Sequence, residues 1–305
     1  MCRLGSFVRS TRATVSLLLV LAGVVAWAQS TPAVVAQSAT PAPQAATAPP
    51  DQPTHAPDAK ADDELLAKTS RLYYSTRTAG PAGFDCQVHP DWHTLFTSDS
   101  KGEAIAEDDA RILVLKPVKV TVHARMNGQS TLEWVRTPDP ENPLDSDSSI
   151  LLDRMHEATE QAMQGFLQFW IPFVDGSVVP ASSEGLKVTR SGSDFTIQAE
   201  QNGAQVTEIF SNEMILQHFN VITNGVSIQF APSYQSTEKG LLVNHFDAHI
   251  QSVDQPSSAA QVMHVGVLYA TLDGLFIPSN LNMEVVGTGT FNMAMDGCRI
   301  IQGSK

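Results

Sequence analysis

The residues best suited to chemistry are two histidines and an aspartate that alternate along one stretch of chain. His245, Asp247 and His249 occupy every second position, and in a β-strand such positions face the same side of the sheet. Two imidazoles and a carboxylate are a ligand set that suits zinc or another transition metal. Side chains with this spacing stand about 6.5–7 Å apart along a strand. Joint ligation of one ion therefore needs help from a neighbouring strand.

A second interpretation of this segment needs no metal. Apolar residues alternate with the three polar ones, as they do on a strand with one buried side and one side in water. The histidines and the aspartate would then form a solvated face. The apolar positions are Leu242, Phe246, Ala248 and Ile250. Two further histidines, His218 and His264, lie on strands predicted nearby in the sequence.

Established catalytic motifs are missing from the sequence. It contains no Gly-x-Ser-x-Gly elbow, no His-Glu-x-x-His helix, no phosphate loop and no dinucleotide fingerprint. The sequence therefore indicates no reaction and no cofactor. It favours a protein that is not an enzyme.

The N-terminus has the three parts of a secretory signal peptide. A basic start with Arg3, Arg9 and Arg12 precedes an apolar run of about 13 residues, and Ala26-Trp27-Ala28 supplies a small-x-small cleavage pattern. A spanning helix needs roughly 20 residues, so we expect cleavage of residues 1–28 instead of a retained membrane anchor. The predicted location is the periplasm or the extracellular medium.

Composition limits the partners of the predicted mature chain. Loss of three arginines with the signal peptide takes the net charge from −13 to −16. Such a surface repels phosphate backbones, so we expect no nucleic-acid binding. Residues 29–60 are rich in Ala, Pro, Gln, Thr and Ser and predict a disordered linker. We expect a single folded domain over 61–305, without a further transmembrane segment.

Two cysteines, Cys86 and Cys298, remain after the predicted cleavage removes Cys2. An even number of cysteines in an exported chain favours a disulfide, although two buried free thiols are the alternative. Only one intramolecular pairing exists. If the bond forms, the first and last strands of the domain must lie side by side.

Two stretches show the spacing of helices. A short helix is predicted over 62–74. A longer one is predicted over 148–170, with Asp147 or Ser148 as its N-cap and Pro172 as its stop. The apolar stripe of the longer helix ends in an aromatic cluster: Phe166, Phe169, Trp170 and Phe173.

A hairpin is predicted around Asn127-Gly128, which is a strong turn signal. A strict two-residue loop would set Val122 opposite Glu133. One additional residue in the turn would bring Leu132 and Trp134 to the apolar face, so we expect a bulged or three-residue turn.

From about residue 185 the chain reads as a succession of alternating strands separated by turn signals. Short links between consecutive strands imply an antiparallel meander, and nine or more twisted strands tend to curl. We therefore predict an α+β fold. It would be a curled antiparallel meander, an incomplete barrel, with two main helices of which the longer packs on the concave face. The predicted strands cover 186–190, 194–200, 204–211, 213–222, 226–232, 241–251, 261–271, 275–286 and 290–301.

This order of elements resembles the lipoprotein-carrier superfamily, the half-barrels that sort outer-membrane lipoproteins. The likeness is carried by an N-terminal helix that runs into a strand (Leu65 to Val88), a mid-chain helix and a final meander. Within the meander, Asp273-Gly274-Leu275-Phe276-Ile277-Pro278 is similar to a strand opening common in such proteins, and Lys239-Gly240-Leu241-Leu242-Val243 is similar one hairpin earlier.

The resemblance implies a cavity for a lipid acyl chain or another apolar group. Methionine adapts well to irregular apolar ligands, and aromatic side chains of the long helix could form a lid. Packing of the same residues into a core is the alternative. The predicted ligand-binding residues are Phe166, Phe169, Trp170, Met263, Met283 and Met293.

Three hypotheses for function follow. The first is an exported, non-enzymatic protein that binds a lipid or other apolar ligand in a half-barrel. The second is a structural or interaction protein of the cell envelope with a filled core. The third is a metal-dependent hydrolase that uses His245 and His249.

Overall fold

A computed structural model provides the structure of the protein. It describes residues 59–76, 80–96, 105–137, 144–175, 178–180, 182–201, 203–255, 260–287 and 289–303. The predicted signal peptide and the predicted linker up to residue 58 lie outside the described residues. The first described element is a helix that begins at Ala59, two residues before the predicted start of the domain.

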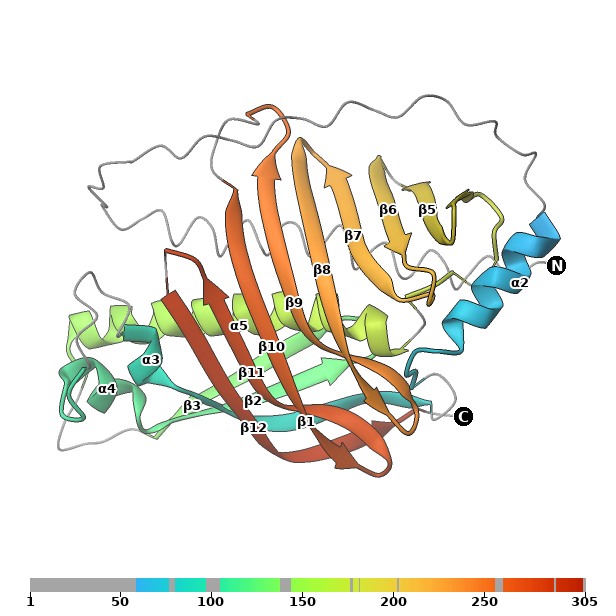
Figure 1. The fold of residues 1–305 in the computed structure, drawn as a ribbon. Helices are drawn as coiled ribbons and strands as arrows, with labels where there is room; N and C mark the ends of the chain where they lie inside the picture. The colour runs from blue at the N-terminus through green and yellow to red at the C-terminus, as the bar shows by residue number, and fades with distance from the viewer. Residues whose placement is uncertain are drawn as a thin grey trace.

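The described part of the chain forms one antiparallel sheet of twelve strands (Figure 1). The strand order is β3-β2-β1-β12-β11-β10-β9-β8-β7-β6-β5-β4, so β4 to β12 form a meander and β3 to β1 extend it beyond β12. The strands are β1 (Pro81–Pro90), β2 (Val118–Arg125), β3 (Ser130–Arg136), β4 (Lys187–Ser191), β5 (Asp194–Gln201), β6 (Ala204–Phe210), β7 (Leu216–Thr223), β8 (Val226–Thr237), β9 (Gly240–Ser252), β10 (Gln261–Leu272), β11 (Leu275–Val285) and β12 (Gly289–Gln302).

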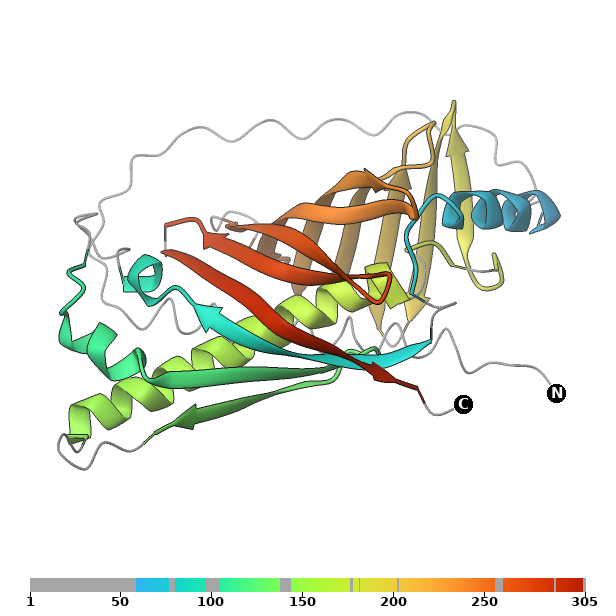
Figure 2. The same cartoon turned by 90° about the horizontal axis from the view of Figure 1, so that it is seen from below.

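Four helices accompany the sheet in the described residues: α2 (Ala59–Ser70), α3 (Trp92–Phe96), α4 (Ala110–Leu115) and α5 (Ser146–Asp175). The sheet is curved and stays open, with β3 and β4 as its two edges (Figures 1 and 2). The prediction of an α+β fold built on an open, curled antiparallel meander is confirmed at this level. Among the described residues, no helix has the length and apolar character required to span a membrane.

The first helix is shorter than predicted. α2 ends at Ser70, whereas the sequence pattern extended it to residue 74. The chain is instead extended at Tyr73, because Leu241 N donates to Leu72 O (2.7 Å) and Tyr74 N donates to Leu241 O (2.9 Å). Gly240 permits this approach, since a Cβ there would lie 2.8 Å from Leu72 O.

The long helix is longer than predicted at both ends. Its first turn is capped by Asp145, whose Oδ1 accepts a hydrogen bond from Ser148 N (2.7 Å), and not by Asp147 or Ser148. The helix also continues through Pro172 to Asp175. Proline removes one helical hydrogen bond and usually ends a helix. Here the final turn carries Phe173 and Val174 into the core, and this burial offsets the missing bond.

Aromatic side chains near the end of α5 join distant strands of the sheet. The Phe169 ring lies 4.0 Å, centroid to centroid, from Phe246 on β9 and 4.6 Å from Phe230 on β8. Trp170 contacts Phe84 on β1 edge to face, with the ring centroids 6.1 Å apart. One helix thus contacts strands on both sides of the β1–β12 pairing, and the main apolar core lies between this helix and the sheet.

The hairpin register is confirmed. Val122 pairs with Leu132 and Val120 pairs with Trp134, as a turn longer than two residues requires. This register turns Val120 and Val122, both almost fully buried, toward the core.

Two short helices that the sequence did not predict build a second core around the beginning of α5. Trp92 of α3, together with Ile112 and Leu115 of α4, packs with Met155 of α5. Five- and six-residue helices hold too few turns to show a helical period. Their function here is to cover apolar surface that β3 and α5 would otherwise expose.

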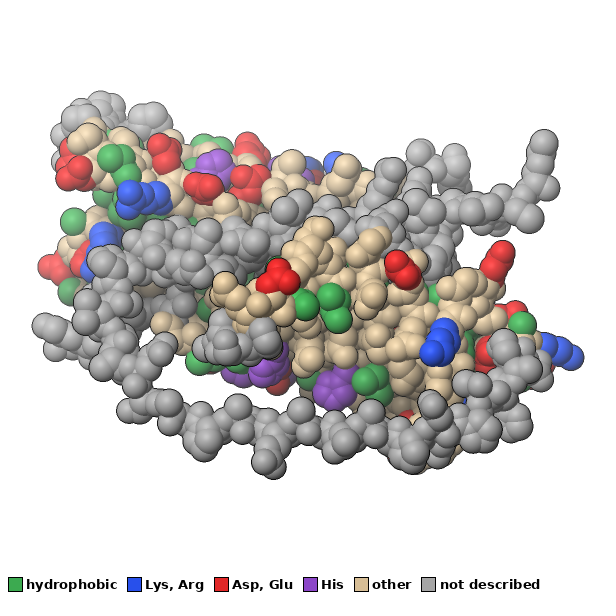
Figure 3. Space-filling view, turned by 90° about the horizontal axis from the view of Figure 1, so that it is seen from above, with side chains coloured by type: hydrophobic (Ala, Val, Ile, Leu, Met, Phe, Trp, Pro, Cys, Tyr) green, Lys and Arg blue, Asp and Glu red, His purple; other side chains and the backbone are tan. Residues whose placement is uncertain are grey.

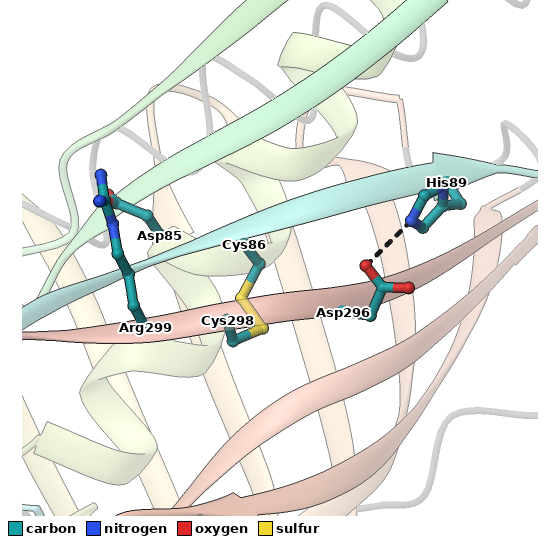
Figure 4. The surroundings of a disulfide bond; sticks show 6 residues. All are labelled: Asp85, Cys86, His89, Asp296, Cys298 and Arg299. Carbon is teal, nitrogen blue, oxygen red and sulfur yellow. Dashed lines mark hydrogen bonds and ion pairs between the residues drawn. A yellow bond between two sulfur atoms is a disulfide. The ribbon is translucent and has the colours of Figure 1, made fainter.

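A disulfide joins the first and last strands, as predicted. Cys86 on β1 and Cys298 on β12 are bonded across 212 residues of chain (Figure 4). The strand register shifts between Asp85 and Gln87, so that Gly297 and Cys298 together face Cys86. Gly297 has a φ of 55°, a conformation that glycine adopts without strain.

Removal of the disulfide should destabilise the fold without changing its topology. We expect the double variant Cys86→Ala/Cys298→Ala to lose about 2–5 kcal/mol of unfolding free energy, because the unfolded chain regains the freedom of a long loop. Urea unfolding followed by circular dichroism measures the loss.

Reduced wild-type protein serves as the control and should unfold at the urea concentration of the double variant. A wild-type midpoint that reductant leaves unchanged would contradict the structural role of the bond.

Candidate functional site

The six side chains predicted to bind an apolar ligand all lie in the main core. All six belong to one cluster of buried apolar side chains that includes residues of α5 and of the sheet. Their exposed fractions are 3% for Phe166, 5% for Phe169, 1% for Trp170, 8% for Met263, 9% for Met283 and 1% for Met293. An occupant of this core therefore has to displace side chains or shift α5.

Polar contacts fix the position of Trp170 within this interior. Its indole Nε1 donates to the hydroxyl of Tyr269 on β10 (2.8 Å), and that hydroxyl in turn donates to Val243 O on β9. Burial raises the pKa of Tyr269 above its ordinary range, although the hydrogen bond from Trp170 opposes the shift. The phenol therefore stays protonated and keeps donating at neutral pH.

A buried carboxyl group lies on the apolar side of β6. Glu208 is 8% exposed, and its Oε2 has no hydrogen-bond partner. Its register neighbours are Ile197 on β5 and Phe219 on β7. Desolvation raises the pKa of Glu208 to about 8, because a charged carboxylate is strongly disfavoured away from water. At neutral pH the group is therefore mostly a neutral acid that can both donate and accept a hydrogen bond.

Two tyrosines accompany this carboxyl group. Tyr73 and Tyr234 meet edge to face, with ring centroids 5.4 Å apart, and Glu208 interacts electrostatically with both. The Tyr73 hydroxyl donates to Met214 O (3.0 Å) and accepts from Leu216 N (2.7 Å). The Tyr234 hydroxyl is buried without a partner.

Burial makes both phenols harder to ionise than an ordinary tyrosine. It raises the pKa of Tyr73 to about 12 against the opposing hydrogen bond from Leu216 N, and it raises the pKa of Tyr234 well above the ordinary value. Glu208 Oε2 and the Tyr234 hydroxyl are thus two buried polar atoms without partners that lie near each other, beside the Tyr73 hydroxyl, whose hydrogen bonds are satisfied. Five other buried side-chain atoms of the described residues also lack a partner. Buried polar groups without partners cost about 1–3 kcal/mol each, and proteins retain few of them.

Sequence reasoning missed Glu208, although a signal for it exists. Ala204, Val206 and Phe210 alternate on the buried side of β6, and Glu208 interrupts their series. A carboxyl group at an apolar position of a strand marks either a buried pair or a binding group.

The predicted histidine segment lies on the outer face of the sheet, but the third residue of the cluster is His264 instead of His249. The ligand atoms of His245, Asp247 and His264 lie within 4.8 Å of one another. Asp247 Oδ1 is 3.1 Å from His245 Nε2 and also hydrogen-bonds with His264 Nδ1 from the neighbouring strand β10. The hydrogen bond from His264 is the main cause that lowers the pKa of Asp247; partial burial opposes this shift and His245 adds to it.

The structure does not bring His249 into this group. His249 is exposed on β9 and pairs in register with Val262 on β10, whereas His264 stands directly opposite Asp247. His218 lies on β7 opposite Ile209. Within the described ranges, no other group of three or more histidine, cysteine or acidic side chains meets the same distance criterion.

A third polar cluster surrounds the disulfide (Figure 4). Asp85 accepts from Arg299 Nε and contacts His123 Nδ1, both at 2.9 Å, while His89 Nε2 lies 3.1 Å from Asp296 Oδ1. Burial alone raises the pKa of Asp85, but the contacts with His123 and Arg299 outweigh it and leave the pKa below its ordinary value. These groups satisfy one another and hold β2, β1 and β12 together.

Comparison of the chain with protein-family models, with curated proteins and with solved structures returns no match. The resemblance to the lipoprotein carriers therefore stays a sequence-based expectation.

The buried Glu208 should make stability depend on pH in a defined direction. Its pKa rises from an ordinary 4.5 to about 8 on folding, so the folded state holds the proton more tightly. The stability from this group is complete below pH 4.5 and is lost as the pH rises through 8. The loss is at most about 1.4 kcal/mol per pH unit within that window.

The variant Glu208→Gln cannot ionise and should not show this loss. Urea unfolding at pH 5, 6.5 and 8 should therefore reveal a stability difference that moves in favour of the variant with increasing pH. Other titrating groups contribute equally to both proteins. A difference that is the same at pH 5 and pH 8 would show that the Glu208 carboxyl is not desolvated.

Proposed function

We propose that this protein is exported and binds an amphiphilic ligand on the concave side of its open sheet. The apolar part of the ligand would lie between α5 and the meander, and one polar end would meet Glu208 and Tyr234. The proposed location is the periplasm or the extracellular medium. Support for the proposal comes from one observation above all: Glu208 Oε2 and the Tyr234 hydroxyl are buried near each other without hydrogen-bond partners.

The unpaired groups favour a ligand because a filled structural core gains nothing from them. Replacing a buried, unsatisfied carboxyl group with an apolar side chain of similar volume is neutral or stabilising. The fold keeps Glu208 despite this cost. A ligand hydroxyl or amine that donates to the Glu208 carboxyl and accepts from the Tyr234 hydroxyl would satisfy both groups.

The way in which α5 is attached to the sheet supports the proposed position of the apolar part of the ligand, between this helix and the meander. The contacts of Phe169 and Trp170 with the sheet are made by side chains. The strands are joined to one another by backbone hydrogen bonds that do not involve α5. The C-terminal turn of α5 is also held by the backbone, since Val174 O accepts from Thr76 N (2.6 Å). A shift of the preceding turns breaks no strand pairing, and the buried methionines on β10, β11 and β12 can repack around a chain of irregular shape.

A gain in stability together with a loss of binding is the signature of this site. We expect Glu208→Leu to be as stable as the wild type or more stable, because the desolvation cost disappears. We also expect it to bind its ligand at least about tenfold more weakly, the equivalent of one lost buried hydrogen bond. Native mass spectrometry and solvent extraction of the purified full chain identify the bound molecule, and a titration with that molecule measures the affinity.

Glu200→Leu on β5 is the matched control, since Glu200 is exposed and carries the same functional group. It should bind like the wild type. If gentle purification of the wild type yields an empty protein, or if Glu208→Leu loses stability and binds normally, the packed-core hypothesis of a structural or interaction protein is correct instead.

A further inference from the structure

We infer that His245, Asp247 and His264 on the outer face of β9 and β10 form a binding site for a divalent transition-metal ion of the zinc class. The site is independent of the proposed ligand site, because it lies on the opposite face of the sheet. Two imidazole nitrogens and a carboxylate oxygen already lie within 4.8 Å of one another.

Cross-strand pairing brings the third ligand close enough. His264 faces Asp247 directly in the β9–β10 register, and directly paired side chains in a sheet stand about 4.5–5.5 Å apart at Cβ. His249 offers the same chemistry but depends on the longer spacing along one strand. The register of the sheet thus selects His264 over His249 as a ligand.

The ligand atoms need only small adjustments to bind an ion. Metal–ligand bonds of about 2.0–2.2 Å in a tetrahedral arrangement place neighbouring ligand atoms about 3.3 Å apart. His245 Nε2 and Asp247 Oδ1 are already 3.1 Å apart. The three side chains are between 36% and 43% exposed, so rotation about their side-chain bonds meets little resistance.

Small residues leave room above the site. Gly266 on β10 stands opposite His245, and Ala231 on β8 stands opposite Asp247. Neither carries a side chain large enough to cover the ligands, so a hydrated ion can approach from solvent. Figure 3 shows histidine side chains in purple at the surface of the molecule.

Charge around the site attracts cations. Glu284 on β11 pairs in register with His264 and is exposed on the same outer face. The whole chain has a net charge of −13. An acidic surface raises the local concentration of cations and speeds their encounter with the site.

The ligand set also defines which ions fit. Imidazole nitrogen suits zinc, copper and nickel, whereas magnesium and calcium prefer sites made of oxygen alone. Three protein ligands leave at least one position for water or an external group. Because the trio is open to solvent, binding of the ion is what the geometry supports; a water-excluding cleft of the kind that aids hydrolysis is not part of it.

Isothermal titration of the untagged full chain with zinc chloride tests the site. We expect about one ion per chain for the wild type and no comparable uptake of magnesium. His264→Ala and His245→Ala should each weaken zinc binding at least about tenfold. A histidine purification tag must be absent, since it would bind zinc itself.

His249→Ala is the matched control, because His249 is an exposed histidine on the same strand and the same face. It should retain wild-type affinity. Circular dichroism on each variant verifies that the sheet is intact. A wild type that takes up no more zinc than His264→Ala, or a loss in His249→Ala equal to that in His264→Ala, would overturn the assignment.

Discussion

The pairing of β1 with β12 is the interaction that makes one sheet out of two parts of the chain. On one side stand β1, β2 and β3, and on the other stands the meander from β12 to β4. The Cys86–Cys298 disulfide fixes this junction covalently, and the Asp85–Arg299 and His89–Asp296 contacts flank it. α5 then spans the junction from inside the core, because Trp170 contacts Phe84 on β1 while Phe169 contacts β8 and β9. The position of the long helix thus depends on where these two strands meet.

The sequence predicted those parts of the fold that depend on residues close to one another along the chain. Alternation and turn residues located the strands of the meander, and the apolar character of Leu132 and Trp134 predicted the register of the first hairpin. The even number of cysteines left by the predicted cleavage predicted the disulfide. What could not be predicted depends on distant contacts. α2 ends early because Leu241 pairs with the backbone of Leu72 and Tyr74, and α5 passes Pro172 because its last turn is buried.

The same distinction between local and distant contacts explains the two candidate sites. A strand pattern shows that His245, Asp247 and His249 share a face, but only the register between β9 and β10 shows that His264 lies closer to Asp247. Glu208 was visible as an interruption of an apolar series. Its companions Tyr73 and Tyr234 come from segments far from it in the sequence, so the polar cluster itself needed the structure. Both sites thus arise from alternation: one occupies the outer positions of its strands, and the other occupies an inner position that an apolar side chain would ordinarily fill.

The separation between Cys86 and Cys298 also has a consequence for the order of folding. Most of the meander is made of neighbouring strands, and such hairpins form from short loops within microseconds. The disulfide between β1 and β12 spans 212 residues. Closing so long a loop costs conformational entropy before the contacts that it brings together contribute any stability. Among the described strands, β1, β2 and β3 are attached to the meander only through β12. The meander can therefore assemble locally, whereas these three strands can join it only once β12 is in place.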